Sequence, residues 1–416
     1  MGMTISEKIL ARHSDNTVVK PGQIVNGKVS RVMLPDAGAG VYKNFKELNI
    51  PKVFDLEKVV LVLDHNSPPC TVGQTASVMR NIAFSEEYGL KYFYNMKGVS
   101  HQIMHEDGFV KPGDLIVGCD SHTVTYGALG AFSTGMGGTE ATWVTAKGEL
   151  WLRVPETIRF EFTGKLPDRL MGKDLILKIL SLIGPDGATY KSMEFGGETI
   201  RNLSIDGRLC MCNMAVEAGG KNGIVEVDEK TVEYLKDKVD GEIEILTSDP
   251  DCEYSKVINI DVTDLEPQVA CPHNPGNVKP VTEIAGTKVD QVLIGSCTGG
   301  RMEDYRMAAE IMKGKKIPRR MRCLIIPAST KIYMQLMKEG LLELFNECGC
   351  IIANSQCGPC GGVQMGFIGA GEACLGTHNR NFQGRMGSPE GGIYLASPTV
   401  AAATALAGVI ADPRNV

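Results

Sequence analysis

The stretch QVLIGSCTGGR, residues 291–301, joins an apolar, strand-like run to a glycine-rich loop that carries Cys297. A second stretch, CIIANSQCGPC at residues 350–360, has the same arrangement and carries Cys357 and Cys360. Such runs followed by glycine-rich loops are typical of parallel α/β sheets, whose ligands gather beyond the carboxyl ends of the strands. Together the loops offer three thiols, one fewer than the four that fill a four-iron cluster, so one iron would stay open to a substrate oxygen.

The tetrapeptide Cys357-Gly358-Pro359-Cys360 is ambiguous on its own. Its spacing suits a cluster, a dithiol redox motif or, with Cys348 and Cys350, a four-thiol zinc site. A thioredoxin-like motif normally lies near the first strand of its domain, whereas this one lies near the end of the chain. We expect Cys348 and Cys350 to be packed thiols. Six further cysteines are expected to be inert core residues: Cys70, Cys210, Cys252, Cys271, Cys323 and Cys374.

Composition limits the class of protein. The chain has 416 residues, enough for two or three domains, with 43% hydrophobic and 22% charged residues. Its net charge of −6 gives no general attraction to nucleic acid or to an anionic membrane. No apolar run approaches the ~20 residues that span a bilayer, and the N-terminus is too polar for a secretory signal. Thirteen cysteines without a signal peptide indicate reduced thiols and a cytoplasmic protein.

Short β-branched runs alternate with longer helical runs, which predicts an α/β fold with mainly parallel sheets. We expect three contiguous domains, at residues 1–155, 156–279 and 280–416. No internal repeat is visible. The expected strands are residues 59–63, 115–117, 157–163, 291–294 and 350–353, and the expected helices are residues 75–87, 139–152, 302–313, 331–345 and 399–410.

Histidines follow two of the expected strands, next to carboxylates. Asp64 and His65 follow the strand at 59–63, and Asp120 and His122 follow the strand at 115–117. A carboxylate orients an imidazole and raises its pKa, which suits it to protonate a leaving hydroxyl. The alternative is a buried His–Asp pair with no chemical role. His101 is a third imidazole of this kind.

Three weaker patterns accompany these motifs. Asn213 and Glu217 share a face if their segment is helical. Arg380 and Arg385 flank a Gly384 turn and suit bidentate binding of a carboxylate. The glycine-rich run at 135–138 follows no clear strand, so tight helix–loop packing is expected there rather than a phosphate loop.

Taken together, the motifs resemble the aconitase superfamily, and most closely the separate large subunits of the isopropylmalate isomerase and homoaconitase type, including the dimethylmalate dehydratases. The resemblance runs in order through nearly the whole chain. It is carried by Asp64-His65, His101-Gln102, Gly118–Thr123, Gly135–Gly138, Asn213…Glu217, Gly295–Thr298, Cys357…Cys360, Asn379–Arg385 and Tyr394–Pro398.

The resemblance implies a three-domain core with the cluster and active site between domains. It implies that Cys297, Cys357 and Cys360 ligate a 4Fe–4S cluster whose fourth iron binds the substrate. His65, backed by Asp64, would protonate the departing hydroxyl. The remaining matched positions are the pairs His101–Asp120 and His122–Glu217 and the substrate- or cluster-contacting residues Ser121, Asn213, Asn379, Arg380 and Arg385.

The chain departs from the family pattern in three places. Gly299 follows Thr298 where the family usually has Asn, so a hydrogen bond near the cluster is missing or comes from another residue. Pro35 stands where relatives carry His, Gln or Asn before an Asp, which removes a donor to a substrate carboxylate. The chain also ends without the swivelling domain of single-chain aconitases, so a separate small subunit is expected to supply it.

The expected protein is therefore the large subunit of a hetero-oligomeric hydro-lyase. Its expected reaction is the reversible dehydration of a hydroxy di- or tricarboxylate, with isopropylmalate or dimethylmalate first and homocitrate-type acids next. Two other classes stay open at this point. One is a non-catalytic, iron-sensing binding protein, disfavoured by the acidic charge and the retained site residues. The other is a zinc-dependent lyase or a dithiol oxidoreductase.

Overall fold

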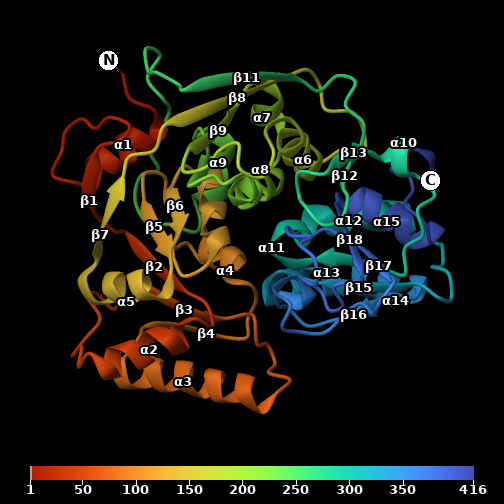
Figure 1. Ribbon diagram of the computed structural model, residues 1–416, viewed down its shortest axis with the longest axis horizontal. Coiled ribbons are helices and arrows are strands. Elements are labelled where there is room, and N and C mark those ends of the chain that lie inside the picture. Colours follow the sequence, from red (N-terminus) through yellow and green to blue (C-terminus); the bar gives the residue numbers. More distant parts are fainter. Residues whose placement is uncertain (1) are drawn as a thin grey trace. The chain divides into compact units, whose positions relative to one another are not determined.

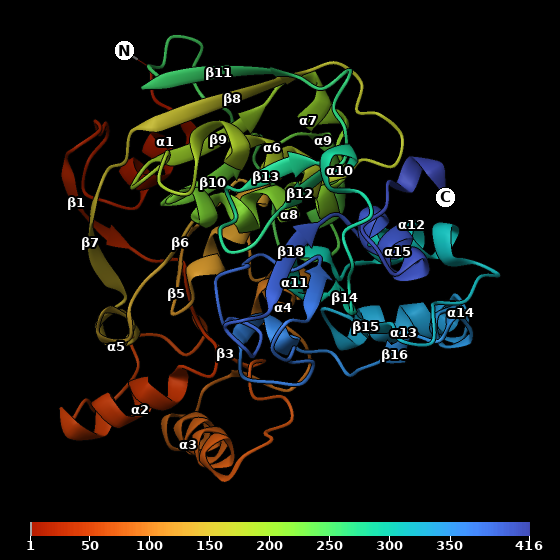
Figure 2. The ribbon, with the colours of Figure 1, turned by 45° about the vertical axis from the view of Figure 1, so that its right-hand side comes forward.

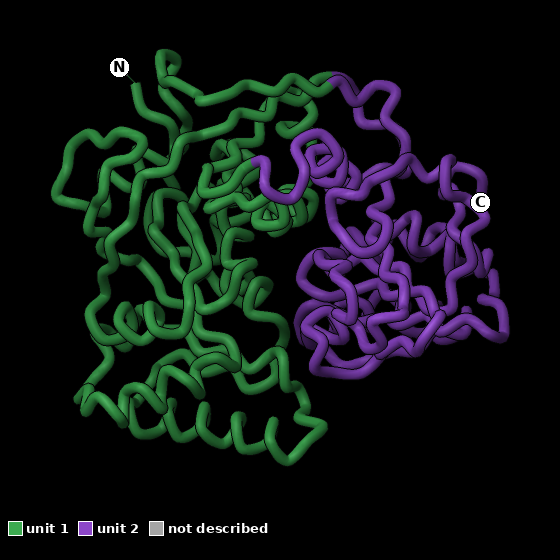
Figure 3. The backbone as a smooth tube through the Cα atoms, viewed as in Figure 1, with its two compact units in different colours: residues 1–163, 188–260 green, residues 164–187, 261–416 purple. Residues whose placement is uncertain are grey.

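The computed structural model describes residues 2–416. They form two compact units, shown in different colours in Figure 3. The first unit comprises Met1–Thr163 and Ala188–Ile260, and the second comprises Gly164–Gly187 and Asp261–Val416. Each unit is built around parallel β-sheet flanked by helices (Figure 1).

A five-stranded parallel sheet forms the framework of the first unit. Its order is β4-β3-β2-β5-β6, so the chain adds two strands on one side of β2 and then two on the other. The carboxyl ends of β2 and β5 therefore lie at a topological switch point, where open α/β sheets bind their ligands. The strands are β2 (Arg31–Leu34), β3 (Val59–Leu63), β4 (Tyr92–Asn95), β5 (Leu115–Gly118) and β6 (Phe132–Gly135).

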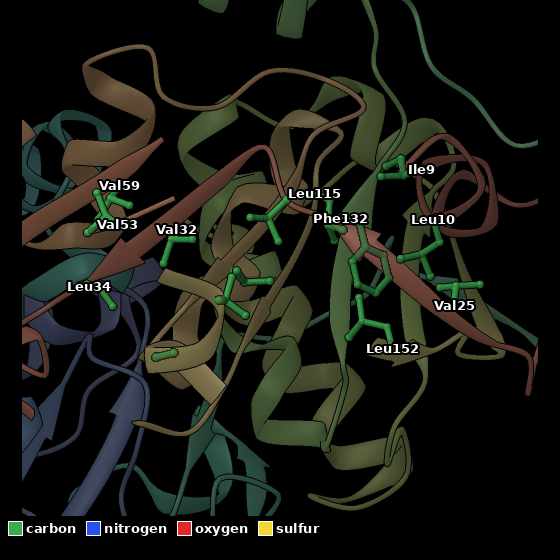
Figure 4. Close-up of a cluster of buried hydrophobic side chains, with 14 of the residues drawn as sticks. Ile9, Leu10, Val25, Val32, Leu34, Val53, Val59, Leu115, Phe132 and Leu152 are labelled. Atoms are coloured by element: carbon green, nitrogen blue, oxygen red, sulfur yellow. The ribbon is translucent and has the colours of Figure 1, made fainter. Parts of the chain in front are cut away.

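Burial explains why these short runs become strands. All five residues of β3 are buried, as expected for a strand covered on both faces. The core contains Val32, Val59, Leu115 and Phe132 from four neighbouring strands (Figure 4). Figures 1 and 2 show α2 (Gly38–Glu47) and α3 (Val72–Tyr88) lying side by side. Phe45 of α2 packs against Phe84 of α3, with 5.5 Å between the ring centroids.

Two smaller sheets complete the first unit. One pairs β1 (Ile24–Lys28) with β7 (Glu149–Arg153), and the other has the order β10-β9-β8-β11. Its strands are β8 (Thr157–Thr163), β9 (Ser192–Gly196), β10 (Asn222–Val225) and β11 (Lys256–Asp261). The other helices are α1 (Ile5–Arg12), α4 (Ser100–Glu106), η1 (Ser121–Leu129), α5 (Gly138–Lys147), α7 (Glu198–Asn202), α8 (Ile205–Asn213), η2 (Met214–Ala218) and α9 (Glu229–Leu235).

The second unit holds a seven-stranded sheet with the order β13-β12-β18-β17-β14-β15-β16. Five of its strands are parallel and again grow from a central strand, β14, first to one side and then to the other. Its strands are β12 (Gln268–Ala270), β13 (Val278–Pro280), β14 (Gln291–Gly295), β15 (Arg322–Ile326), β16 (Ile351–Ile352), β17 (Ala373–Gly376) and β18 (Gly392–Ala396). Its helices are α6 (Gly172–Ile183), α10 (Val281–Ile284), α11 (Ser296–Gly299), α12 (Met302–Met312), α13 (Thr330–Lys338), α14 (Leu341–Cys348), η3 (Gly358–Gly361), α15 (Pro398–Ala407) and η4 (Pro413–Asn415).

The predicted α/β class with mainly parallel sheets is confirmed, but three local predictions are wrong. The helix expected at 139–152 ends at Lys147, because Gly148 adopts a left-handed conformation and strand β7 follows. The helix expected at 331–345 is two helices, separated at Gly340, whose φ is +71°. The run at 135–138 does follow a strand, β6.

The three contiguous domains stay a prediction. Each main sheet falls largely within one of the expected segments, although β12 and β13 precede residue 281 and join the sheet of the last segment. The chain instead forms two compact units. Helix α6 packs on β12 and so belongs to the second unit, although the residues before and after its segment belong to the first. Within residues 2–416, none of the helices combines the length and the apolar character that crossing a membrane requires.

Substitution of Gly127 tests the close packing of η1 on β10. A Cβ at Gly127 would lie 1.7 Å from the main-chain oxygen of Gly223, so we expect Gly127→Ala to lower the free energy of unfolding by about 3 kcal/mol. The control is Gly40→Ala in α2, where a Cβ meets no atom within 4 Å. The control should stabilise the helix by about 0.5–1 kcal/mol. Urea denaturation measures both, and equal effects would contradict the described packing.

Candidate functional site

Three loops of the first unit bring carboxylates and imidazoles together beyond the ends of neighbouring strands. Asp36 follows β2, Asp64 and His65 follow β3, and Asp120 follows β5. Because β3, β2 and β5 are adjacent and parallel, their carboxyl ends meet at one edge of the sheet. The strand-end pattern in the sequence had indicated two of these three loops, those after β3 and β5, as places for candidate residues.

His65 lies among three carboxylates. Its Nδ1 is 2.6 Å from Asp64 Oδ1 and 3.9 Å from Asp36 Oδ2, and its Nε2 is 3.9 Å from Asp120 Oδ2. Burial works to lower the pKa of His65, but the facing carboxylates outweigh it, Asp64 most of all, and raise that pKa to about 10. The imidazole is therefore a cation at neutral pH and has a proton to give.

Asp120 connects the other two imidazoles. His101 Nε2 lies 2.9 Å from Asp120 Oδ1, and the main-chain N–H of His122 donates to the same oxygen at 2.8 Å. Burial opposes ionisation of Asp120, but His101 and His122 outweigh it and hold its pKa well below the usual range. The Nε2 atom of His122 lies 2.7 Å from Oε1 of buried Glu217. The two predicted His–carboxylate pairs are thus present as contacts.

Ser121 and Asn213 belong to the same constellation. Ser121 Oγ lies 3.4 Å from His122 Nδ1. Buried Asn213 donates to Thr125 Oγ1 at 2.8 Å, and Thr125 in turn donates to the main-chain oxygen of His122. Asn213 therefore contacts the η1 turn that carries His122, while Ser121 lies beside the ring itself.

The three thiols of the predicted cluster lie in the second unit, on loops beyond the ends of its parallel strands. Cys297 lies in α11 directly after β14, and Cys357 and Cys360 lie at η3 after β16. All three are buried. Cys348 and Cys350 are also buried, as expected of packed thiols. Of the six cysteines expected to fill the core, Cys70 is exposed and Cys252 is half-buried, so for these two the prediction is wrong.

Asn379, after β17, connects two of the thiols. The Cys360 thiol donates to Asn379 Oδ1 at 3.1 Å, and Asn379 Nδ2 donates to Cys297 Sγ at 3.7 Å. Arg385 Nε donates to the main-chain oxygen of Cys360 at 2.7 Å. Arg380 instead places its guanidinium over the Phe382 ring, 5.9 Å from the centroid. Asn379 and Arg385 thus lie at the thiol site, and Arg380 lies on the loop between them.

Two buried cations bind main-chain oxygens of the loops near the thiols. Buried Lys173 of α6 donates to the main-chain oxygens of Thr377 and His378, and buried Arg301 donates to that of Thr298. Burial, helped by Lys173 and Arg385, lowers the pKa of His378 to about 3. The thiolate is the form of cysteine that ligates metal, and it is an anion. The donor set and its charge fit an anionic iron–sulfur cluster.

One of the two local departures, Gly299, has a structural explanation. The side chain of Thr377 packs against Gly299, where an added Cβ would lie 2.5 Å from Thr377 Cβ. Thr377 Oγ1 also accepts the main-chain N–H of Gly295 at 2.9 Å. No side chain fits at 299 beside it, and Asn379 supplies the donor to Cys297. The Pro35 carbonyl accepts the Gly38 N–H in the turn after β2, a bond that any residue could make, so the structure gives no explanation for the proline.

Two residues, one near each group of candidate residues, were not predicted from the sequence. Asp36 follows an apolar run, Val32–Leu34, and the rule that identified Asp64 would have found it. Lys173 gave no local signal, because a lysine at the start of an apolar helix normally reaches solvent. Its burial depends on the loop after β17, more than 200 residues later.

A family model and curated relatives match nearly the whole chain. The model of the Aconitase family (aconitate hydratase) matches residues 8–408. The 3-isopropylmalate dehydratase large subunit of Moorella thermoacetica is 50% identical, with 100% of both chains covered. That of Sulfurihydrogenibium sp. is 48% identical, covering 100% of this chain and 97% of the relative. The solved structure of Thermococcus kodakaraensis aconitase X is similar over 90% of this chain and 88% of that chain, with 14% identity and a TM-score of 0.49.

A double-mutant cycle tests the packing of Thr377 against Gly299. Gly299→Asn should lower the free energy of unfolding by about 2–3 kcal/mol, because the new side chain overlaps Thr377. Thr377→Gly removes the overlapping Cβ and hydroxyl groups, so the double variant should be more stable than the sum of the single effects by at least ~0.5 kcal/mol. Additive effects in urea denaturation would show that the two side chains do not compete.

The acid limb of stability tests the environment of Asp120. The pKa of Asp120 is lower in the folded than in the unfolded protein, so the ionised carboxylate stabilises the fold. This contribution to the free energy of unfolding is fully present above the unfolded-state pKa of about 4, and it is lost as the pH falls through the folded-state pKa. Asp120→Asn should cost about 2 kcal/mol at pH 7 and should flatten the pH dependence of unfolding between about pH 5 and 2. Asp15→Asn, at an exposed carboxylate, is the control. Parallel pH curves for wild type and Asp120→Asn would contradict the pairing.

Proposed function

Because the chain belongs to the aconitase family, we propose that it is the large subunit of a two-subunit hydro-lyase that reversibly dehydrates a hydroxy di- or tricarboxylate. The observation that carries the proposal is the full-length similarity, 48–50% identical, to proteins named 3-isopropylmalate dehydratase large subunits. Isopropylmalate is therefore the first substrate to test, followed by dimethylmalate and homocitrate-type acids. The proposed location is the cytoplasm.

The proposed cofactor is a 4Fe–4S cluster held by Cys297, Cys357 and Cys360. Three buried thiols, the Asn379 contacts to two of them and the neighbouring cations support it. When bound, such a cluster supplies a Lewis-acid iron that makes hydroxide a tolerable leaving group. Arg385 fixes the backbone of the loop by holding the Cys360 carbonyl.

His65 is the proposed proton donor to the departing hydroxyl. Its protonated ring is held by Asp64 through Nδ1, which leaves the Nε2 proton to be given away. The main-chain N–H of Ser100 donates to the second oxygen of Asp64 at 2.7 Å, so the carboxylate stays ionised and fixed. In the reverse direction the same ring takes the proton back, which suits a reversible hydration.

The other matched residues bind and orient the substrate in this proposal. Arg380 and Arg385 provide guanidinium groups for a carboxylate, and Ser121 provides a hydroxyl beside His122. Asn213 holds the turn on which His122 lies. Asp120 and Glu217 keep their imidazoles in a single orientation, which lowers the entropic cost of reaching the reactive geometry.

The proposed partner is a small subunit that carries the swivelling domain. The relatives are named large subunits and match this chain over its whole length, which supports a division of the enzyme between two chains. The small subunit is proposed to complete the substrate site, so the large subunit alone should turn over poorly.

Metal content and turnover test this proposal together. The anaerobically purified chain should contain near-equal iron and acid-labile sulfide, and mild oxidation should give the EPR signal of a three-iron cluster. With the small subunit added, the protein should dehydrate isopropylmalate. Cys357→Ala should lose nearly all iron, sulfide and turnover, whereas Cys350→Ala, at a buried thiol on the amino-terminal side of β16, should keep them.

Two results would overturn the proposal. Zinc without sulfide would exclude the cluster and favour a zinc or dithiol protein. A complete cluster without turnover on any of the three acid classes, in the presence of the small subunit, would exclude the hydro-lyase.

A further inference from the structure

Asp36 receives four hydrogen bonds from a single turn, the one that carries His65. The main-chain N–H groups of Asp64 and His65 donate to Oδ2 at 3.0 and 2.8 Å. The main-chain N–H and the side-chain amide of Asn66 donate to Oδ1 at 3.2 and 2.8 Å. Both carboxylate oxygens are thus used to fix three consecutive residues after β3.

Asp36 is itself held from the opposite side. The side chain of Asn81, buried in α3, donates to the Asp36 main-chain oxygen at 3.1 Å. Pro35 precedes it with a restricted φ and no N–H, so the turn after β2 has little conformational freedom. The loop that carries His65 is therefore anchored to a rigid neighbour rather than to solvent.

The same carboxylate also contributes charge to the imidazole. Its Oδ2, which receives the His65 N–H, lies 3.9 Å from His65 Nδ1. The other charged groups facing this ring are Asp64 at Nδ1 and Asp120 at Nε2, and Asp120 is shared with the imidazoles of His101 and His122. Asp36 is thus one of three carboxylates that act on His65.

We propose that Asp36 is a positioning residue for His65: it fixes the turn that presents the imidazole and adds a negative charge beside Nδ1 that keeps the ring protonated. It has no contact with the reacting atoms in this role and acts only through His65. The proposal rests on the proposed function for its catalytic consequence, but its effect on His65 can be measured without turnover.

Asp36→Asn keeps the size of the side chain but removes its charge and, because an amide nitrogen cannot accept, two of the four hydrogen bonds from the turn. The matched control is Asp55→Asn, at the amino-terminal side of β3, where the carboxylate receives a main-chain N–H from Glu57 and faces no histidine. NMR of histidine-labelled full-length protein follows the seven imidazoles. The His65 signal is assigned by its loss in His65→Gln.

In Asp36→Asn the midpoint of the His65 titration should fall by on the order of one pH unit, and in Asp55→Asn it should not move. With the small subunit, kcat of Asp36→Asn should fall by about 10–100-fold with little change in KM, because the substrate contacts are kept. A weaker variant, Asn66→Ala, removes only the side-chain hydrogen bond to Oδ1 and should give a smaller change in the same direction. It replaces Asp36→Asn if that chain does not fold.

An unchanged His65 titration in a folded but less stable Asp36→Asn would overturn the inference and leave Asp36 as a structural anchor. A wild-type enzyme without turnover would overturn the proposed function instead, and the NMR titration would still decide the role of Asp36.

Discussion

A buried charge must be given hydrogen bonds or an opposite charge, and this constraint organises both candidate sites. In the first unit the charges are carboxylates, and they are satisfied by imidazoles and by main-chain N–H groups at the ends of strands. Near the thiols of the second unit, the buried cations Lys173 and Arg301 are satisfied by main-chain oxygens of the thiol-bearing region. Each site therefore fixes its own loops through the charges that it buries.

The sequence predicted the parts of this arrangement whose signals are local. Five consecutive apolar residues at β3, followed by Asp64 and His65, predicted both a strand and the polar residues at its end. The strand β6 was missed because its sequence, Phe-Ser-Thr-Gly, has little apolar character of its own. Its burial comes from η1 and the neighbouring strand, which no local pattern reveals.

Contacts between distant segments were the main obstacle. The reason for Gly299 is Thr377, and the reason for the buried position of Lys173 is the same loop. The two five-strand parallel arrangements share one order, with the first strand in the centre, yet the sequence shows no repeat. Such an order requires only apolar strands and right-handed crossovers, so many different residues satisfy it.

The path of the chain between the two units has a consequence for biosynthesis. The segment Gly164–Gly187 packs with residues that follow Ile260, although Ala188–Ile260 belongs to the first unit. On the ribosome, α6 therefore emerges before its partner β12 exists, and its apolar side chains have no sheet to cover for several seconds at typical rates of synthesis. The first unit can fold as soon as residue 260 is available, while the helix waits for its partner strand. The order of translation thus favours completion of the imidazole site before the thiol site.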